Sequence, residues 1–208
     1  MTNRKLTKGC VLFLLYEYFP KFSGHGVYLK RLFPLIEQQG YKVKVLTFVD
    51  LEKEQGSCLV DGIEVIRIVQ NYTGFRNRLK SMALLLSTLF NMRKQFDILH
   101  FSGHMDIFGA MTVLCKYLKK KVIMQMVLLG TDDPETIANT YKFMSARFAL
   151  LRQLDFVMYI SDAFEEPCLK HGFPKKKLRL VRQGVDTQAF QPMNAETRAE
   201  FRSTLGYR

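Results

Sequence analysis

Short apolar segments alternate with amphipathic segments along almost the whole chain, and this alternation limits the possible folds more than any other feature. The spacing predicts strands over Cys10–Tyr16, Val43–Phe48, Ile63–Val69, Asp97–Phe101, Lys121–Val127, Asp155–Ile160 and Leu178–Val181. It predicts helices over Gly26–Gln39, Phe75–Gln95, Met105–Leu118 and Glu135–Gln153, with another beginning after Ser161. A polar loop is expected from Asp50 to Ser57. Strands joined by crossover helices predict an α/β fold with a doubly wound, mostly parallel, Rossmann-like sheet.

The last part of the chain differs from the rest. We expect one Rossmann-like domain over residues 1–182, followed by a linker and a terminal helix over residues 183–208. Asn194 is the predicted N-cap of that helix, which extends to Leu205. No segment approaches the roughly 20 apolar residues that a membrane-spanning helix needs. The apolar run Val11–Leu15 is too short for a signal peptide and has no small-residue cleavage site after it.

The chain is strongly basic, with 31 Lys and Arg against 19 Asp and Glu and a net charge of +12. Such a surplus favours anionic partners: nucleic acid, acidic lipid headgroups or phosphorylated substrates. Nucleic acid is not expected, because no basic–aromatic interleaving or known binding module is present. The helix Phe75–Gln95 has basic ends and an apolar centre, which fits either contact with an anionic membrane surface or a core helix with solvated ends.

The four cysteines are widely spaced and show no Cys-x-x-Cys or Cys/His pattern. This spacing argues against a zinc site and against a secreted disulfide scaffold, and it predicts a reducing, cytoplasmic environment. Cys10 and Cys115 lie on apolar faces and are expected in the core. His100 and His104 are four residues apart, but they bind one metal only if both lie on one helix, and no third ligand is near. No metal is therefore predicted.

Ser23-Gly24-His25-Gly26 joins the loop after the first strand to the first helix. Glycines there let backbone amides approach a ligand, and a helix N-terminus favours negative charge, so a phosphate or pyrophosphate is the expected guest. The alternative is that these residues only turn the chain and cap the helix. A dinucleotide motif is disfavoured, because Leu29 stands where a third glycine is required and the preceding loop is long.

Other loops at the carboxyl ends of the predicted strands also carry polar groups, and ligands of parallel α/β sheets bind at these ends. Glu17 and Tyr18 follow the first strand, and His100 lies near the end of the fourth. Asp132 precedes a helix that begins near Pro134, where it either contacts substrate hydroxyls or serves as a cap. No Gly-x-Ser-x-Gly element supports a hydrolase.

Several segments share a characteristic order, namely Val11–Leu32, Gln39–Thr47, Phe96–His100, Leu154–Ala163, Gly172–Leu178, Gly184–Thr187 and Phe190–Pro192. Together they resemble the N-terminal, acceptor-binding domain of family 4 (group 1) glycosyltransferases, which have the two-domain GT-B architecture. The resemblance implies transfer of a sugar from a nucleotide diphosphate sugar with retention of configuration, without a cofactor. It places Gly24 and Gly26 against the phosphates of a UDP- or GDP-sugar. It assigns acceptor contacts to Glu17, Tyr18, His25, His100 and Asp132, and it leaves the catalytic group unknown.

Two departures from the family pattern bear on activity. Leu129 occupies the place where the family commonly has His near the transferred sugar, and Gln183 stands where Asn is usual. The second domain, which binds most of the nucleotide, is expected to lie beyond Arg208, so this chain is predicted to be inactive alone. The acceptor is expected to be a saccharide or a glycolipid, reached in the cytoplasm or at the cytoplasmic face of a membrane. The alternative is a non-catalytic module that holds a glycolipid or a partner protein.

Overall fold

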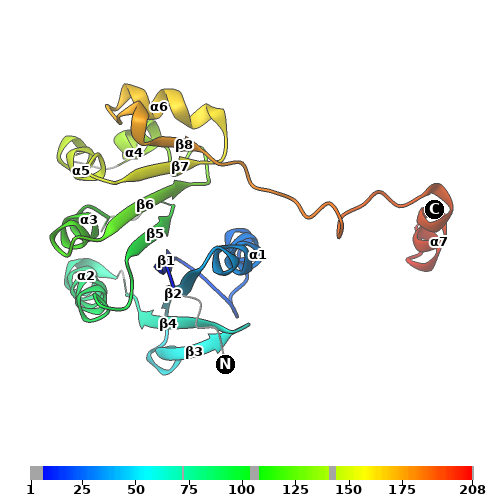
Figure 1. The fold of residues 1–208 in the computed structure, drawn as a ribbon, viewed down its shortest axis with the longest axis horizontal. Coiled ribbons are helices and arrows are strands. Elements are labelled where there is room, and N and C mark those ends of the chain that lie inside the picture. Colours follow the sequence, from blue (N-terminus) through cyan, green and yellow to red (C-terminus); the bar gives the residue numbers. More distant parts are fainter. Residues whose placement is uncertain (1–6, 72, 104–107, 141–143, 208) are drawn as a thin grey trace.

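The computed structural model describes residues 7–71, 73–103, 108–140 and 144–207. One eight-stranded sheet forms the centre of the molecule, and helices cover it (Figure 1). Its strands are β1 (Gly9–Leu15), β2 (Tyr41–Val49), β3 (Gly56–Val60), β4 (Ile63–Val69), β5 (Ile98–Ser102), β6 (Lys121–Met126), β7 (Phe156–Tyr159) and β8 (Leu178–Leu180). The α-helices are α1 (Gly24–Gln38), α2 (Gly74–Asn91), α3 (Phe108–Tyr117), α4 (Pro134–Thr140), α5 (Met144–Leu151), α6 (Glu165–Lys170) and α7 (Ala195–Thr204). Short 3-10 turns are η1 (Glu52–Glu54), η2 (Asp162–Phe164) and η3 (Lys175–Lys177).

The strand order is β3-β4-β2-β1-β5-β6-β7-β8. From β1 the chain moves outward to β2 and β4, and after α2 it returns to the other side of β1 to form β5. The order therefore reverses between β1 and β5, which is where open α/β sheets bind their ligands. All neighbouring strands are parallel except β3 and β4. The predicted doubly wound, mostly parallel α/β sheet is confirmed.

The prediction of a loop over Asp50–Ser57 was partly wrong, because β3 begins at Gly56 and pairs antiparallel with β4. Asp61 and Gly62 join the two strands with φ values of 50° and 82°. Positive φ at both central residues is the geometry of a tight two-residue hairpin turn, and Asp-Gly is among the sequences that favour it. β3 is the edge strand, so its side chains are largely exposed and it lacks the apolar run of a central strand.

Within the described residues, two of the predicted helices differ from the structure by more than two residues at an end or by an interruption. α2 ends at Asn91 rather than Gln95, because the chain turns there to place Phe96 in the core before β5. The described parts of the helix predicted over Glu135–Gln153 are α4 and α5, and residues 141–143 lie outside the described residues.

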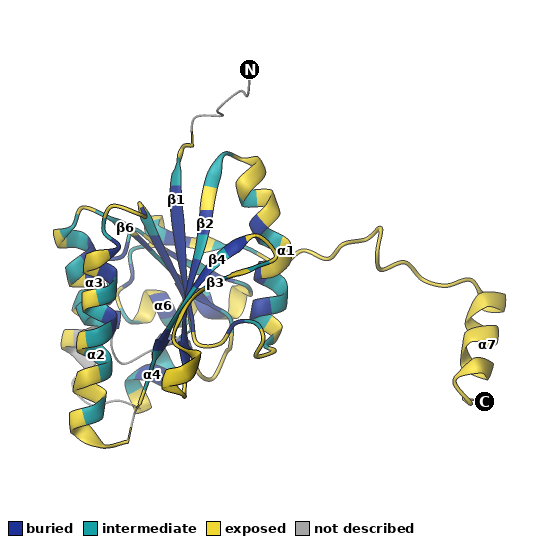
Figure 2. Ribbon diagram, turned by 90° about the horizontal axis from the view of Figure 1, so that it is seen from below, coloured by how far each residue is buried: buried dark blue, intermediate teal, exposed yellow. Residues whose placement is uncertain are grey.

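Alternate side chains of the strands enter two separate hydrophobic cores, as the pleat of a sheet requires. Leu12 and Leu14 of β1 join the larger core beneath α2, α3 and α5, whereas Val11 and Phe13 join a smaller core beneath α1. Figure 1 shows α1 on one face of the sheet and α2 and α3 on the other, and Figure 2 shows the buried strands between them. The predicted burial of Cys10 and Cys115 is confirmed.

Two aspartates align neighbouring strands in the same way. The carboxylate of Asp97, just before β5, accepts a hydrogen bond from the amide of Cys10, and its own amide donates to the carbonyl of Cys10. Asp155, before β7, does the same with the amide and carbonyl of Val122 in β6. Each reciprocal pair sets the register of one parallel strand against the next.

The chain leaves the sheet after residue 182 and passes beside α1 before it reaches α7. Residues 183–207 are exposed, and an extended segment carries α7 clear of the body of the molecule (Figures 1 and 2). Asn194 caps α7 as predicted, since its side chain accepts a hydrogen bond from the amide of Thr197 at 2.8 Å. The proposed boundary at residue 182 stays a prediction.

Candidate functional site

The N-terminus of α1 lies at the strand-order reversal and is open on one side. Ser23 caps the helix, because its side chain accepts a hydrogen bond from the amide of Gly26 at 3.1 Å. A Cβ added to Gly26 would lie 3.0 Å from Ser23 Oγ, whereas one added to Gly24 would meet no atom within 4 Å. Gly26 is thus closely packed against the Ser23 side chain, and Gly24 borders open space. No acidic residue occupies the first turn, so the positive end of the helix dipole is uncompensated by its own helix.

His25 links α1 to β5. Its Nε2 lies 2.7 Å from Ser102 Oγ. Among the described residues, its Nδ1 is buried and has no hydrogen-bond partner. Burial lowers the pKa of His25 to about 4, so the ring is neutral at physiological pH. A neutral imidazole has one donor and one acceptor nitrogen, and here only one of them is used.

His100 and Gln125 extend this polar cluster beneath α1. His100 is two residues before Ser102 on β5 and therefore faces the same side of the sheet, with its ring centroid 4.7 Å from that of Phe13. Burial, with a smaller effect of neighbouring His25, lowers the pKa of His100 to about 3. Among the described residues, His100 Nε2 and both side-chain amide atoms of Gln125 make no hydrogen bond of good geometry, although the Gln125 side chain lies close enough to His100 to oppose the lowering of its pKa. Buried polar atoms are rarely left unpaired, so this cluster is suited to an ordered water or a polar ligand group.

Tyr18 and Glu17 lie on the other side of Gly26. The Tyr18 ring is almost wholly buried against Phe33, and burial raises its pKa to about 12. Glu17 is exposed, and its carbonyl oxygen would lie 3.9 Å from a Cβ on Gly26. Tyr18 is thus part of the core beneath α1, and the acceptor contacts assigned to both residues stay predictions.

Asp132 holds the loop between β6 and α4. Its carboxylate accepts hydrogen bonds from the amides of Val127 and Leu128 at 3.0 and 2.9 Å. The next residue, Asp133, accepts from the amides of Gly130 and Thr136 and so caps α4. Asp132 is buried while Leu129 at the tip of the loop is exposed. The carboxylate of Asp132 therefore supports the loop, and its predicted contact with acceptor hydroxyls stays a prediction.

The structure brings together His25 and His100, which the sequence predicted, with Ser102 and Gln125, which it did not. Ser102 shares the alternation of His100 along β5, and Gln125 is a polar interruption in an apolar strand. These two patterns in the sequence could have indicated that Ser102 and Gln125 belong to the site. Asp132 approaches the cluster through Gly103, where an added Cβ would lie 3.5 Å from its Oδ1. His104 lies outside the described residues.

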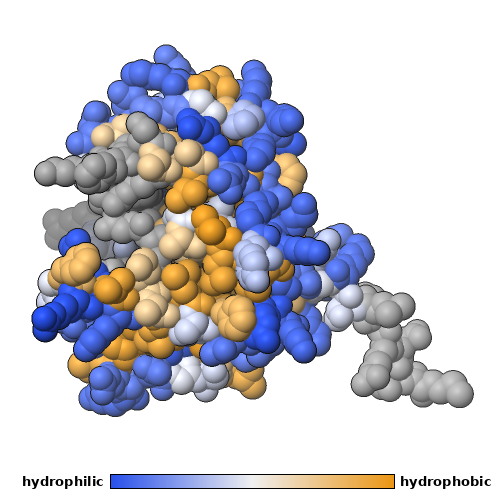
Figure 3. Space-filling model, turned by 90° about the vertical axis from the view of Figure 1, so that its left-hand side faces the viewer, coloured by the Kyte–Doolittle hydropathy of each residue, from blue (hydrophilic) through white to orange (hydrophobic). Residues whose placement is uncertain are grey.

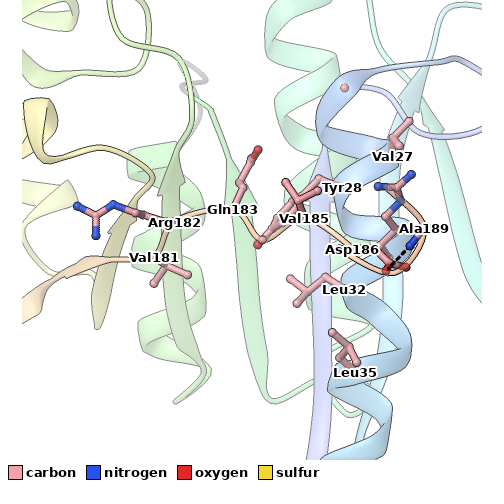
Figure 4. A pocket seen from close by; sticks show the side chains of 13 residues that line it. Val27, Tyr28, Leu32, Leu35, Val181, Arg182, Gln183, Val185, Asp186 and Ala189 are labelled. Carbon is pink, nitrogen blue, oxygen red and sulfur yellow. Dashed lines mark hydrogen bonds between the residues drawn. The ribbon is translucent and has the colours of Figure 1, made fainter. Parts of the chain in front are cut away.

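A cavity of about 940 Å³ opens beside Gly24 and follows the outer side of α1. Tyr28 and Leu32 of α1 and residues of the segment 181–186 line it (Figure 4). Arg31 of α1 also lines the cavity. The guanidinium of Arg31 lies 5.0 Å from the ring centroid of Phe190, which holds the linker beside the helix. The volume is that of a typical small-molecule site. Of the predicted site residues, only Gly24 lines this cavity.

Residues 22–189 match the model of Glycosyltransferase Family 4, and the chain belongs to that family. It is therefore a glycosyltransferase-family domain, and its Rossmann-like sheet corresponds to the predicted N-terminal half of the GT-B architecture. No protein with a curated description matches the sequence.

Solved glycosyltransferase structures have the same fold. HepE from Anabaena, in complex with UDP and glucose, is 14% identical with a TM-score of 0.62 over 95% of this chain and 50% of that one. Sucrose-phosphate synthase from Thermosynechococcus elongatus is 13% identical with a TM-score of 0.60, covering 95% of this chain and 53% of its own. Trehalose-6-phosphate from E. coli, bound with UDP-2-fluoro glucose, is 11% identical with a TM-score of 0.62, covering 95% and 54%. The chain thus spans about half the length of these structures.

Proposed function

We propose that this chain is the acceptor-binding half of a retaining glycosyltransferase that uses a UDP- or GDP-sugar and transfers the sugar to a saccharide or lipid-linked acceptor. The observation that carries the proposal is the open N-terminus of α1 at the strand-order reversal, with Gly24 at the mouth of a cavity of about 940 Å³. An uncompensated helix N-terminus attracts the diphosphate of such a donor. The family membership and the UDP in the HepE structure support the same donor class.

The neutral cluster behind Gly24 suits hydroxyl groups rather than charge. His25 and His100 are uncharged at neutral pH, and their buried, unused nitrogens can donate to or accept from a sugar hydroxyl that enters the cluster beneath α1. A retaining transfer develops positive charge on the sugar and negative charge on the leaving phosphate. In this proposal the positive end of the α1 dipole stabilises the leaving phosphate. The histidine cluster is neutral and therefore does not repel the positive charge that develops on the sugar.

Complete turnover in this proposal needs a second, donor-binding domain. The basis is that the chain corresponds to about half of each related structure. Closing two domains around the substrates excludes water and completes such sites.

We place the reaction in the cytoplasm, and the four free cysteines support that placement. The exposed Leu129, in place of the usual His, favours the second candidate, a binding module without catalysis.

Gly24→Asp tests the proposal directly. The added side chain has room, and an acidic residue in the first turn favours the helix, so thermal stability should stay the same or rise. Its charge should repel a diphosphate and weaken UDP-glucose or GDP-mannose binding about tenfold in calorimetry. Ser57→Asp, on the exposed edge strand β3, is the matched control. Equal donor affinity in both variants contradicts the phosphate role of Gly24.

The chain alone should bind these donors weakly and transfer no sugar. Donor hydrolysis and transfer to added saccharides, followed by release of UDP or GDP, measure this. Turnover by the single chain at enzymatic rates, about 1 per second or faster, contradicts the requirement for a second domain. Donor binding without any transfer after a second GT-B domain is supplied favours the binding module.

A further inference from the structure

The segments that contain α2 and α3 have several Lys and Arg residues but no Asp or Glu. Neither residues 65–96 nor residues 107–131 contain an Asp or Glu. The basic residues of these segments around the two helices are Arg76, Arg78, Lys80, Arg93, Lys94, Lys116, Lys119 and Lys120. Lys116 pairs with Asp155 at the far end of α3. The other basic residues lie near the ends of the two helices.

Exposed apolar side chains lie between these charges. Phe75, Leu79 and Phe90 of α2 are 80%, 49% and 43% exposed, and Val113 and Tyr117 of α3 are 47% and 80% exposed. Figure 3 shows hydrophobic residues gathered on this side of the molecule beside hydrophilic ones. We call this surface, comprising these apolar residues and the basic residues above, the α2–α3 face.

α2 has two apolar sides, and only one of them is used by the fold. Leu85 and Leu89 point into the larger core and are buried. Leu79, Ala83 and Phe90 follow one another at helical spacing on the outer side, where they are exposed. A helix that only covers a sheet needs one apolar stripe, so the outer stripe is available for a partner.

We propose that the α2–α3 face docks on the surface of an anionic lipid bilayer. Lys and Arg at the rim attract acidic headgroups, and Phe, Leu, Val and Tyr side chains enter the boundary between headgroups and acyl chains. Nucleic acid fits less well, because it offers phosphates but nothing to bury Leu79 and Val113. None of the described helices is both long and apolar enough to span a membrane, so this contact is peripheral.

The position of this face suits an enzyme that works at a membrane. α2 and α3 cover the face of the sheet opposite α1 (Figure 1). Docking through them therefore leaves the cavity beside α1 uncovered. The inference does not depend on the glycosyl transfer proposed above, because it rests on the charge and apolar surface of α2 and α3 alone.

Vesicle sedimentation with the full chain tests the proposal. The chain should bind vesicles of equimolar phosphatidylcholine and phosphatidylglycerol and not vesicles of phosphatidylcholine alone. Raising the salt from about 0.1 M to about 1 M should release it, because screening then acts within a few ångströms. Arg76→Glu with Lys80→Glu should weaken binding about tenfold or more. Phe75→Ser, which removes an apolar contact and no charge, should weaken it severalfold.

Matched variants separate this face from net charge and general hydrophobicity. Lys42→Glu with Lys53→Glu makes the same change of charge at exposed positions on β2 and η1, and it should bind nearly as the wild type does. Leu59→Ser removes a comparably exposed apolar residue from β3 and should also bind normally. Equal losses in the control variants overturn the proposal. Equal binding of the chain to both vesicle types also overturns the proposal. The same holds if a single-stranded oligonucleotide binds the α2–α3 face and completely displaces the chain from the vesicles.

Discussion

The two histidines beneath α1 make the stability of the domain sensitive to mild acid. Burial lowers the pKa of His25 to about 4 and that of His100 to about 3, below the ordinary value of 6.5. Between those values the unfolded chain binds more protons than the folded one. The free energy of unfolding should therefore fall as the pH decreases from about 6.5 to about 4, by up to roughly 1.4 kcal/mol per pH unit for each histidine.

Urea denaturation at a series of pH values measures this slope. His100→Asn removes one of the two groups and should reduce the slope by about half. His171→Asn is the control, because His171 is paired with Glu135 at the surface between α4 and α6 rather than placed in this cluster. An unfolding free energy that is constant between about pH 6.5 and 4, or an unchanged slope in His100→Asn, contradicts the prediction.

At the scale of the element, Asp97 and Asp155 each fix the register of two neighbouring parallel strands through reciprocal hydrogen bonds. The carboxylate of Asp155 accepts hydrogen bonds from the amide of Val122 and from Lys116, and it is largely buried. Although burial alone raises the pKa of Asp155, these hydrogen bonds hold it below the usual value. Their stabilisation is therefore present above about pH 4 and is lost as the pH falls through the lower pKa of the folded state.

Asp155→Ala should lower the free energy of unfolding by about 1–3 kcal/mol, because it leaves a strand amide and a lysine without their acceptor. Asp162→Ala breaks an exposed pair with Arg182 and should cost less than about 1 kcal/mol. Chemical denaturation of both variants at neutral pH makes the comparison. Equal small losses would mean that the backbone pairing alone sets the register of β6 and β7.

For the whole molecule, the segment beyond residue 182 should be separable from the sheet. Residues 183–207 are exposed, and their one described aromatic contact with the body is that of Phe190 with Arg31. Limited proteolysis should therefore cut within residues 183–194 first. The remaining domain should keep its free energy of unfolding to within about 1 kcal/mol, the scale of one exposed cation–π contact. A larger loss, or first cleavage within the sheet, contradicts a boundary at residue 182.

Much of this architecture follows from local pattern. Apolar runs of strand length and helical spacing predicted most elements and the parallel sheet, because both periodicities depend on residues close in sequence. β3 was missed since an edge strand buries few side chains, although Asp61-Gly62 offered a hairpin signal. The cap at Asn194 was predicted from the sequence, because it needs only a side chain and an amide three residues on.

The composition of the candidate site was decided by tertiary structure. His25 and Ser102 are 77 positions apart, and only the placement of β5 beside β1 brings their side chains together. Gln125 joins them because β6 pairs with β5 in one particular register. Burial of Tyr18 depends on packing in the same way, whereas the hydrogen bonds of Asp132 to the amides of Val127 and Leu128 are local. The sequence alone determined the family, most of the elements and the basic charge, because those are properties of local pattern and composition. Which polar groups face one another, and which are neutral, depended on the strand order and on burial beneath α1.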